Sequence, residues 1–163
     1  MGEAEITKLS DEDKMEIFRV INEAARKYKN RIPEDCYSEP YMPLSKLEEE
    51  MRKMQFYGYI KDELVGVVGL QYLSDYDVFL IRHLYVLPEF QRRGIGTELL
   101  KFGIAKSPTS RIYVGTWRDA DWAIRFYEKN GFVNLGNDRE LLRKYWGVPE
   151  RQIEESVVLE YRG

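Results

Sequence analysis

Hydrophobic residues repeat at helical spacing in two stretches near the start of the chain. The first stretch carries an apolar stripe in steps of four, three and four positions: Ile17, Ile21, Ala24 and Tyr28. This spacing predicts an amphipathic helix, and the polar run over residues 10–13 has the form of a capping box in front of it. Three prolines over residues 30–44 predict a loop, after which Ser45 and Glu48 are expected to cap a second helix. Its predicted inward residues are Leu47, Met51 and Met54.

Short apolar segments bounded by turn residues predict strands over residues 4–9, 56–60, 64–73, 78–86 and 112–115, another from Phe132, and a last one over 157–161. The segment 78–86 is apolar on both faces near its start, which is typical of a central strand. Further helices are predicted over residues 97–106 and from Asp119 to Asn130, the second ended by Gly131 in the left-handed conformation. A short helix over residues 138–146 is predicted between the last two strands.

This order of elements predicts an α/β fold with a mixed sheet. The early strands are joined by short turns and should pair antiparallel, whereas the strands on either side of the helix 97–106 are joined by a crossover and should be parallel. A chain of 163 residues fits one domain, predicted here over residues 1–163.

The segment Gln91-Arg92-Arg93-Gly94-Ile95-Gly96 joins the predicted central strand to the next helix. Such a loop leaves backbone N–H groups free at a helix N-terminus, where they and the helix dipole bind phosphate. Glycine allows the anion to approach the backbone because it has no Cβ. The same pattern also fits a simple tight turn with solvated arginines, although cations are disfavoured at a helix N-terminus unless an anion is present.

A second motif follows in the predicted helix after the next strand: Ala123-Ile124-Arg125-Phe126-Tyr127-Glu128-Lys129-Asn130-Gly131-Phe132. Together with Leu84-Tyr85-Val86-Leu87-Pro88 and the glycine loop, it resembles the two motifs of the GNAT N-acetyltransferase family, Q/R-x-x-G-x-G/A and A-x-x-F-Y-x-K-x-G-F. Two motifs in the family's order are more specific than either alone, and the matching part covers residues 78–132. The resemblance implies a GNAT-like, mostly antiparallel mixed sheet, flanked by helices, whose parallel central strand pair splays apart.

The resemblance also implies that acetyl-CoA is the co-substrate, with no metal. The implied binding residues lie in a strand bulge, in the glycine loop and in the second motif: Leu84, Tyr85, Val86, Gln91, Arg92, Arg93, Gly94, Ile95, Gly96, Thr97 and Phe126.

Two residues are candidates for proton transfer. Tyr127 matches the tyrosine that many members of the family use as general acid toward the leaving sulfur, and a phenol of pKa ~10 is protonated at neutral pH. Without the resemblance it would be assigned to the core. The strand before the glycine loop has no carboxylate where the family often places its base, so His83, the only histidine, is the candidate base. A structural histidine, with deprotonation through a water chain, is the alternative.

The acceptor is a small molecule or a peptide that carries a primary amine, as the resemblance implies. Four aromatic residues could line its pocket or simply pack: Tyr37, Tyr41, Trp117 and Trp122. Arg82 could pair with a carboxylate of the substrate or form a structural ion pair. The segment from residue 138 to the turn at 147–149 is expected to cover the acceptor site, contact a second copy in a homodimer, or cover the core. Ala120 replaces an asparagine that is common in the family, so one contact is missing or replaced.

Composition narrows the remaining possibilities. The net charge of −3 does not favour a nucleic-acid partner, and no apolar run reaches the length of a membrane span. The single cysteine, Cys36, excludes an internal disulfide framework and fits a cytoplasmic protein.

The leading hypothesis is an N-acetyltransferase that moves an acetyl group from acetyl-CoA to a primary amine. A non-catalytic acyl-CoA-binding sensor or partner module is the alternative. A Rossmann-type nucleotide domain is weaker, because the third glycine of its fingerprint is missing and hairpins precede the motif.

Overall fold

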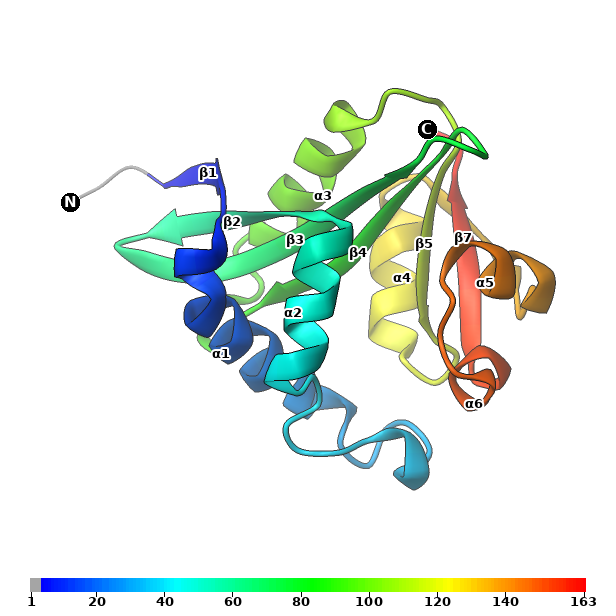
Figure 1. Cartoon of the computed structure of the whole chain (residues 1–163), viewed down its shortest axis with the longest axis horizontal. Coiled ribbons are helices and arrows are strands. Elements are labelled where there is room, and N and C mark those ends of the chain that lie inside the picture. Colours follow the sequence, from blue (N-terminus) through cyan, green and yellow to red (C-terminus); the bar gives the residue numbers. More distant parts are fainter. Residues whose placement is uncertain (1–3) are drawn as a thin grey trace.

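One seven-stranded mixed sheet forms the centre of the computed structural model, which describes residues 4–163 (Figure 1). Its strands are β1 (Glu5–Lys8), β2 (Gln55–Lys61), β3 (Glu63–Leu73), β4 (Val78–Val86), β5 (Ile112–Trp117), β6 (Phe132–Gly136) and β7 (Ser156–Tyr161). Their order in the sheet is β1-β2-β3-β4-β5-β7-β6. All neighbours are antiparallel except β4 and β5, which are parallel. The predicted fold class is therefore confirmed, and the antiparallel hairpins exclude a Rossmann sheet.

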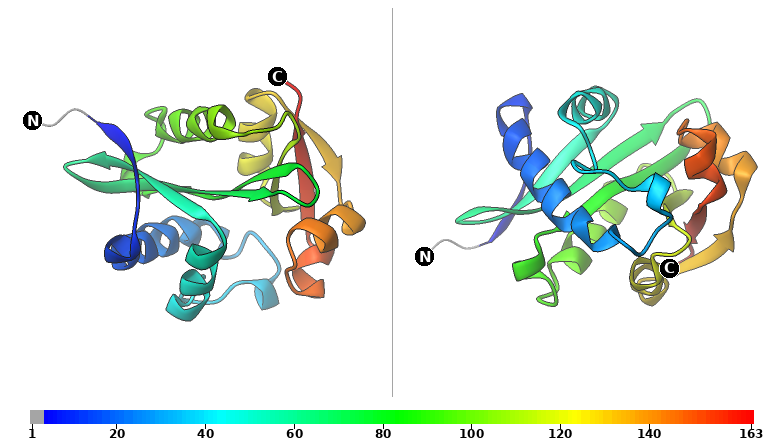
Figure 2. Two further views of the ribbon diagram at one scale, coloured as in Figure 1. Left: turned by 45° about the horizontal axis from the view of Figure 1, so that its top comes forward. Right: turned by 90° about the horizontal axis from the view of Figure 1, so that it is seen from below.

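Helices cover both faces of this sheet. They are α1 (Lys14–Ala25), α2 (Leu44–Lys53), α3 (Ile95–Lys106), α4 (Asp121–Lys129), α5 (Arg139–Tyr145) and α6 (Glu150–Glu154). Figure 2 shows α3 and α4 on one face and α1, α2, α5 and α6 on the other. The predicted short helix before the last strand is α5, and α6 was not predicted. The single-domain prediction for residues 1–163 stays a prediction, and its first three residues lie outside the described part of the chain.

The parallel pair β4–β5 is joined over a short length only. Its register contains two residue pairs, Phe79 with Ile112 and Leu80 with Tyr113. Beyond Leu80, β4 keeps its partner β3 and β5 keeps its partner β7. The C-terminal halves of the two central strands therefore diverge, as the resemblance implied, and this opening positions the site.

The predicted helix ends are partly confirmed. The backbone N–H of Ser10 donates to Asp13 at 2.8 Å in the expected capping box, which opens a 3-10 turn directly before α1. Gly131 has a φ of 93° and follows α4 in the left-handed conformation. The caps predicted for the other two helices are wrong: α2 begins at Leu44 after Pro43, and α4 has Ala120 as its N-cap. The N-cap of α2 lies two residues before Ser45, and the N-cap of α4 lies one residue after Asp119.

The apolar stripes predicted from the sequence form the core between the helices and the sheet. Ile17, Ile21 and Leu47 are fully buried there. Glu50 is also almost fully buried, with 1% of its surface exposed, and the buried set contains no other charged residue within residues 4–163. No helix in this part of the chain is long and apolar enough to cross a membrane.

Candidate active site

A β-bulge in β4 lies where the central strands separate. Val67 of β3 pairs with Tyr85 and Gly69 pairs with Arg82, so His83 and Leu84 together face Val68. His83 has a φ of 53°, in the left-handed region that non-glycine residues rarely adopt. The bulge was expected around residues 84–86, and it begins one residue earlier.

The splay leaves backbone groups of β4 without a strand partner. After Leu80 no residue of β4 pairs with β5, so the edge that faces the opening presents N–H and C=O groups. An extended chain that carries amides can pair with such an edge as an added strand. The pantetheine arm of acetyl-CoA has this chemistry.

The glycine loop begins α3 in a way that suits an anion. Arg92 and Gly94 have φ values of 65° and 81°, and Gly94 is the N-cap without any side-chain cap for the helix. The first N–H groups of α3 have no intrahelical acceptor, and the helix dipole is positive there. The amide of Gln91 donates to the carbonyl of Val86 at 2.9 Å and so fixes the loop to the end of β4.

A cavity of about 480 Å³, here called the α3-side cavity, runs from this loop to the bulge and α4. Most of the predicted cofactor-binding residues line it: Leu84, Tyr85, Val86, Gln91, Arg92, Gly94, Ile95, Gly96, Thr97 and Phe126. Arg93 is not among the lining residues, and its guanidinium lies 5.2 Å from the ring centroid of Phe90, which does line the cavity. Its role in cofactor binding stays a prediction.

The lining of the α3-side cavity is suited to a polyanion. It contains Lys27, Arg92 and Lys129 but no carboxylate. Burial, followed by repulsion from Arg31, Arg92 and Arg125, lowers the pKa of Lys27 below its usual value. Unneutralised cations gathered around one opening favour a ligand with several negative charges, and the phosphates of CoA meet this requirement.

Tyr127 lies in the wall of the α3-side cavity and is largely buried. Its ring packs edge-on against Phe126 and Phe132, with centroid distances of 5.3 and 5.6 Å. Burial raises the pKa of its hydroxyl above the usual 10, so the group is protonated at neutral pH. None of the side-chain hydrogen bonds among residues 4–163 uses this hydroxyl, which leaves it available to a ligand. Tyr127 therefore packs in the core and also lines the cavity, and its role as general acid stays a prediction.

A second cavity of about 350 Å³, here called the α2-side cavity, lies on the opposite face of the opening. The loop after α1 contributes Asp35, Cys36 and Tyr41, and the segment between β6 and β7 contributes Trp146, Val148, Pro149, Arg151 and Gln152. The ring of Trp146 packs over Gly115 of β5, where an added Cβ would approach it to 3.1 Å. The prediction that the segment from residue 138 covers a site is thus consistent with its place in this wall.

The aromatic residues considered from the sequence do not share one cavity. Tyr41 and Trp117 line the α2-side cavity, and the Trp117 indole N–H donates to the Tyr41 hydroxyl at 2.7 Å. Trp122 lines the α3-side cavity instead, beneath the ammonium of Lys27. Tyr37 lines neither cavity and stacks on Tyr41. Ala120 is buried beside Trp117, so it replaces the polar contact of the family's asparagine with packing.

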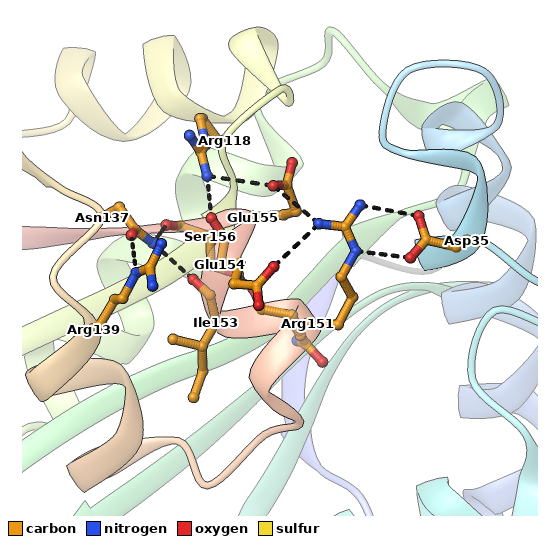
Figure 3. Close-up of polar contacts among 10 residues, drawn as sticks. Asp35, Arg118, Asn137, Arg139, Arg151, Ile153, Glu154, Glu155 and Ser156 are labelled. Carbon is orange, nitrogen blue, oxygen red and sulfur yellow. Dashed lines mark hydrogen bonds and ion pairs between the residues drawn. The ribbon is translucent and has the colours of Figure 1, made fainter.

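The two halves of the α2-side cavity are connected by an ion pair (Figure 3). Arg151 of α6 contacts both carboxylate oxygens of Asp35, at 2.7 and 3.0 Å. Glu154 and Glu155 also lie within 3.4 Å of the Arg151 guanidinium. Asn137 donates to the carbonyls of Ile153 and Ser156 and so secures the end of α6.

Glu50 is a buried carboxylate beside His83 that the sequence analysis did not single out. Its Oε1 lies 2.8 Å from Nε2 of His83 and 3.1 Å from a guanidinium nitrogen of Arg82. Arg82 therefore has a protein partner, as one of its two predicted roles required. Glu50 lies three positions after Leu47 and four before Met54, on the predicted apolar stripe of α2. The signal in the sequence was this charged residue at a position where the helical spacing predicts a buried apolar one.

Charge and burial determine the protonation of this pair. Burial by itself raises the pKa of Glu50, but the hydrogen bond and charge of His83, with the charges of Arg82 and Lys46, outweigh it and bring the pKa to about 2. Burial lowers the pKa of His83, the Glu50 bond opposes this, and the charge of Arg82 adds to the lowering. At neutral pH the pair is an ionised carboxylate and a neutral imidazole.

The fold and the two cavities define an acyl-CoA-dependent transferase, and comparison with known proteins identifies its family. The profile of the Acetyltransferase (GNAT) family matches residues 17–132. The chain belongs to this family and is an acetyl-CoA-dependent acetyltransferase that acts on an amine acceptor. This result favours the enzyme over a non-catalytic binding module.

Solved structures with the same fold cover almost the whole chain. The structure of the PaiA N-acetyltransferase of Thermoplasma acidophilum, in complex with coenzyme A, has a TM-score of 0.71 at 21% identity and covers 99% of this chain and 100% of that one. An acetyltransferase of Streptococcus agalactiae has a TM-score of 0.73 at 19% identity, with 99% of each chain covered. A GNAT acetyltransferase of Staphylococcus aureus reaches 0.69 at 22% identity, covering 98% of this chain and 100% of that one. These similarities support the fold.

Proposed function

We propose that this enzyme transfers an acetyl group from acetyl-CoA to the primary amine of a small molecule or a peptide, with His83 as general base and Tyr127 as general acid. The observation that carries the proposal is that the two cavities meet. Tyr28, His83, Tyr85, Gly115 and Thr116 line both of them, at the point where β4 and β5 separate. A donor on the α3 side and an acceptor on the α2 side would therefore reach each other through the sheet.

Acetyl-CoA supplies the reactive thioester, and its charge and amide arm match the α3-side cavity. The acceptor amine belongs in the α2-side cavity, whose volume of about 350 Å³ suits a small molecule or the end of a peptide. An alkyl ammonium has a pKa of ~10.4 and must lose a proton before its nitrogen can attack.

The residues at the junction supply the proton transfers. His83 takes a proton from the ammonium, which leaves a neutral nitrogen. That nitrogen then bonds to the carbonyl carbon as the carbon–sulfur bond breaks, and its second proton passes to solvent. Tyr127 gives its proton to the leaving thiolate. Backbone N–H groups of the bulge would stabilise negative charge on the carbonyl oxygen. Each of these steps uses a group that lines at least one of the cavities.

A thiol-release assay with acetyl-CoA and a panel of amines, amino acids and peptides tests the proposal. We expect turnover with at least one amine class, and lower turnover in His83→Ala. Because the pKa of His83 is lowered, the acid limb of the wild-type rate profile should lie below about pH 6.5 and be absent from the variant. Binding of acetyl-CoA without turnover for any amine would contradict the proposal. An unchanged pH profile in His83→Ala would assign deprotonation to water.

The cofactor is tested separately by calorimetric titration with acetyl-CoA, NAD and ATP. We expect acetyl-CoA to bind most tightly, and equal or tighter binding of NAD would contradict the assignment of the α3-side cavity. We also propose that the enzyme works in the cytoplasm, which its single cysteine supports. A homodimer contact through the segment between β6 and β7 stays a prediction, and light scattering of the purified protein tests it.

A further inference from the structure

Arg82 and His83 are consecutive in β4, yet both contact the same carboxylate oxygen of Glu50. In a regular strand, successive side chains point to opposite faces of the sheet, so two neighbours cannot reach one atom on one face. The left-handed backbone of His83, in the bulge, removes this restriction by turning its side chain toward α2. The strained conformation thus has a specific result, which is the contact between His83 and Glu50.

Neutralisation of Glu50 does not explain this contact. The Arg82 guanidinium already pairs with Glu50 at 3.1 Å and is itself 8% exposed, with its other nitrogen donating to Gln71 of β3 at 3.1 Å. Lys46 and Lys53 of α2 lie 4.0 and 3.7 Å from Oε2. On the remaining side, Phe56 of β2 stacks on the imidazole with a centroid distance of 5.8 Å. The carboxylate has enough positive charge around it without a histidine.

The hydrogen bond fixes which nitrogen of His83 carries the proton. An ionised carboxylate can only accept, so Nε2 of the neutral imidazole must be the donor. Nδ1 then holds the free electron pair. The side chain of His83 is 14% exposed and lines both cavities, so it is in reach of a ligand on either side.

We infer that Glu50 is a positioning residue for the transfer reaction: its Oε1 holds His83 as the Nε2–H tautomer, turned by the bulge, and leaves Nδ1 to take the proton of the acceptor amine. This inference rests on the proposed base role of His83. Glu50 belongs to the wall of the α2-side cavity but is only 1% exposed, and in this arrangement its Oε1 contacts the imidazole rather than the reacting atoms. It acts through the orientation and tautomer of the imidazole.

The chain contains one histidine, which makes the tautomer directly measurable. Long-range ¹H–¹⁵N correlation spectra of protein labelled at histidine, with any affinity tag removed, report each ring nitrogen separately. We expect the wild type above pH 7 to show a protonated Nε2 and a bare Nδ1. A protonated Nδ1, or a mixture of the two tautomers, would overturn the inference.

Two substitutions separate the hydrogen bond from the charge. Glu50→Ala removes the acceptor, so the tautomers should mix and kcat should fall at least about tenfold, toward the ~10²-fold loss expected when a general base is removed. Glu50→Gln keeps a carbonyl oxygen for Nε2, so it should retain the tautomer and most of kcat. Loss of the negative charge in this variant should move the acid limb of kcat/KM to lower pH. Glu48→Gln is the matched control on the same helix, because Glu48 pairs with Lys14 and lines neither cavity.

The outcomes are distinct. A folded Glu50→Ala protein with the wild-type tautomer and kcat would overturn the inference, and so would a Glu50→Gln protein as slow as Glu50→Ala. If Glu50→Ala does not fold, the inference is still tested by the tautomer of the wild type and by the kcat and pH profile of Glu50→Gln. An absence of acetyl transfer by the wild type would contradict the proposed function instead, and an Nδ1–H tautomer in an active wild type would contradict only the role of Glu50.

Discussion

Asp35 and Arg151 are 116 positions apart in the chain and form a bidentate ion pair between two walls of the α2-side cavity (Figure 3). Both side chains are about half exposed, at 61% and 46%, so the pair lies at the opening rather than in the core. The Arg151 hydrogen bond is the main reason that the pKa of Asp35 lies below its usual value, which keeps the pair charged at neutral pH. An exposed pair of this kind adds little stability, but it limits how far the two walls can separate.

Arg151→Met should therefore change acceptor binding and leave the donor unaffected. We expect KM for the acceptor to change severalfold, with KM for acetyl-CoA and the melting temperature close to wild type. High salt should have the same effect on the wild type and a smaller one on the variant, because screening weakens exposed pairs. Arg143→Met is the matched control: Arg143 forms an equally exposed pair with Glu150 of α6, and neither residue lines the cavity. Identical acceptor kinetics in both variants would show that the Asp35–Arg151 pair has no part in acceptor binding.

The two glycines of the loop should respond differently to substitution. A Cβ at Gly96 would lie 3.5 Å from the Phe126 ring and 3.9 Å from Val86, which is ordinary contact, so Gly96→Val should fold. Its side chain would enter the α3-side cavity and weaken acetyl-CoA binding by about tenfold or more, since the ligand loses close approach to the backbone. Gly94→Val adds strain of about 1–2 kcal/mol, because its φ of 81° is left-handed.

Circular dichroism and calorimetric titration check this pair of variants. Gly96→Val should have a near-native melting temperature but bind acetyl-CoA weakly. Gly94→Val should have a lower melting temperature and also bind acetyl-CoA weakly. A folded Gly96→Val protein with normal affinity for acetyl-CoA would mean that the loop is only a turn.

The fold could be predicted because its signals are local. Apolar residues that recur every two positions indicate strands, and those that recur every three to four positions indicate helices. The crossover connection through α3 makes β4 and β5 parallel. The glycine loop and Tyr127 could be assigned because their motifs are contiguous. What could not be predicted depends on contacts between distant segments. No glycine marks the bulge at His83, and its conformation is held by the pairing with β3.

Glu50 shows the same limit. It is the third of three consecutive glutamates, and helical phase alone indicates that it faces inward with Leu47. Its partners belong to β4, 32 and 33 positions away, so the role of the carboxylate appears only in the folded chain. The ion pair of Asp35 with Arg151 is equally invisible, because 25 basic and 28 acidic residues allow many pairings.

Acid should destabilise the protein in two stages, and the free energy of unfolding should fall in each of them as the pH is lowered. The folded state holds the pKa of His83 below the ordinary 6.5, so the unfolded state binds the extra proton first and stability falls as the pH drops below about 6.5. Glu50 has a folded pKa of about 2 against an ordinary 4.5. Its contribution is therefore complete above pH 4.5 and is lost between 4.5 and 2.

Urea unfolding across this range of pH measures both stages. In His83→Ala the first stage should disappear. The second should become smaller and end at a higher pH, since the hydrogen bond that lowers the folded pKa of Glu50 is gone. Glu48→Gln should show the wild-type profile between pH 6.5 and 5. Stability that rises on acidification from pH 7 to 5 would contradict the assigned protonation states.

Tyr127→Phe tests the general acid with the smallest change available. The substitution removes one hydroxyl and keeps the ring between Phe126 and Phe132, so the fold should be retained. If this hydroxyl protonates the departing thiolate, kcat should fall by about 10²-fold, at the low end for acid catalysis. Affinity for acetyl-CoA should change little, because a thioester sulfur is a weak acceptor before the bond breaks. Tyr161→Phe is a matched control, since Tyr161 also packs on Phe132 but lines neither cavity. Full turnover of Tyr127→Phe at saturating acetyl-CoA would show that solvent supplies the proton, and equal losses in both variants would assign the effect to packing around Phe132.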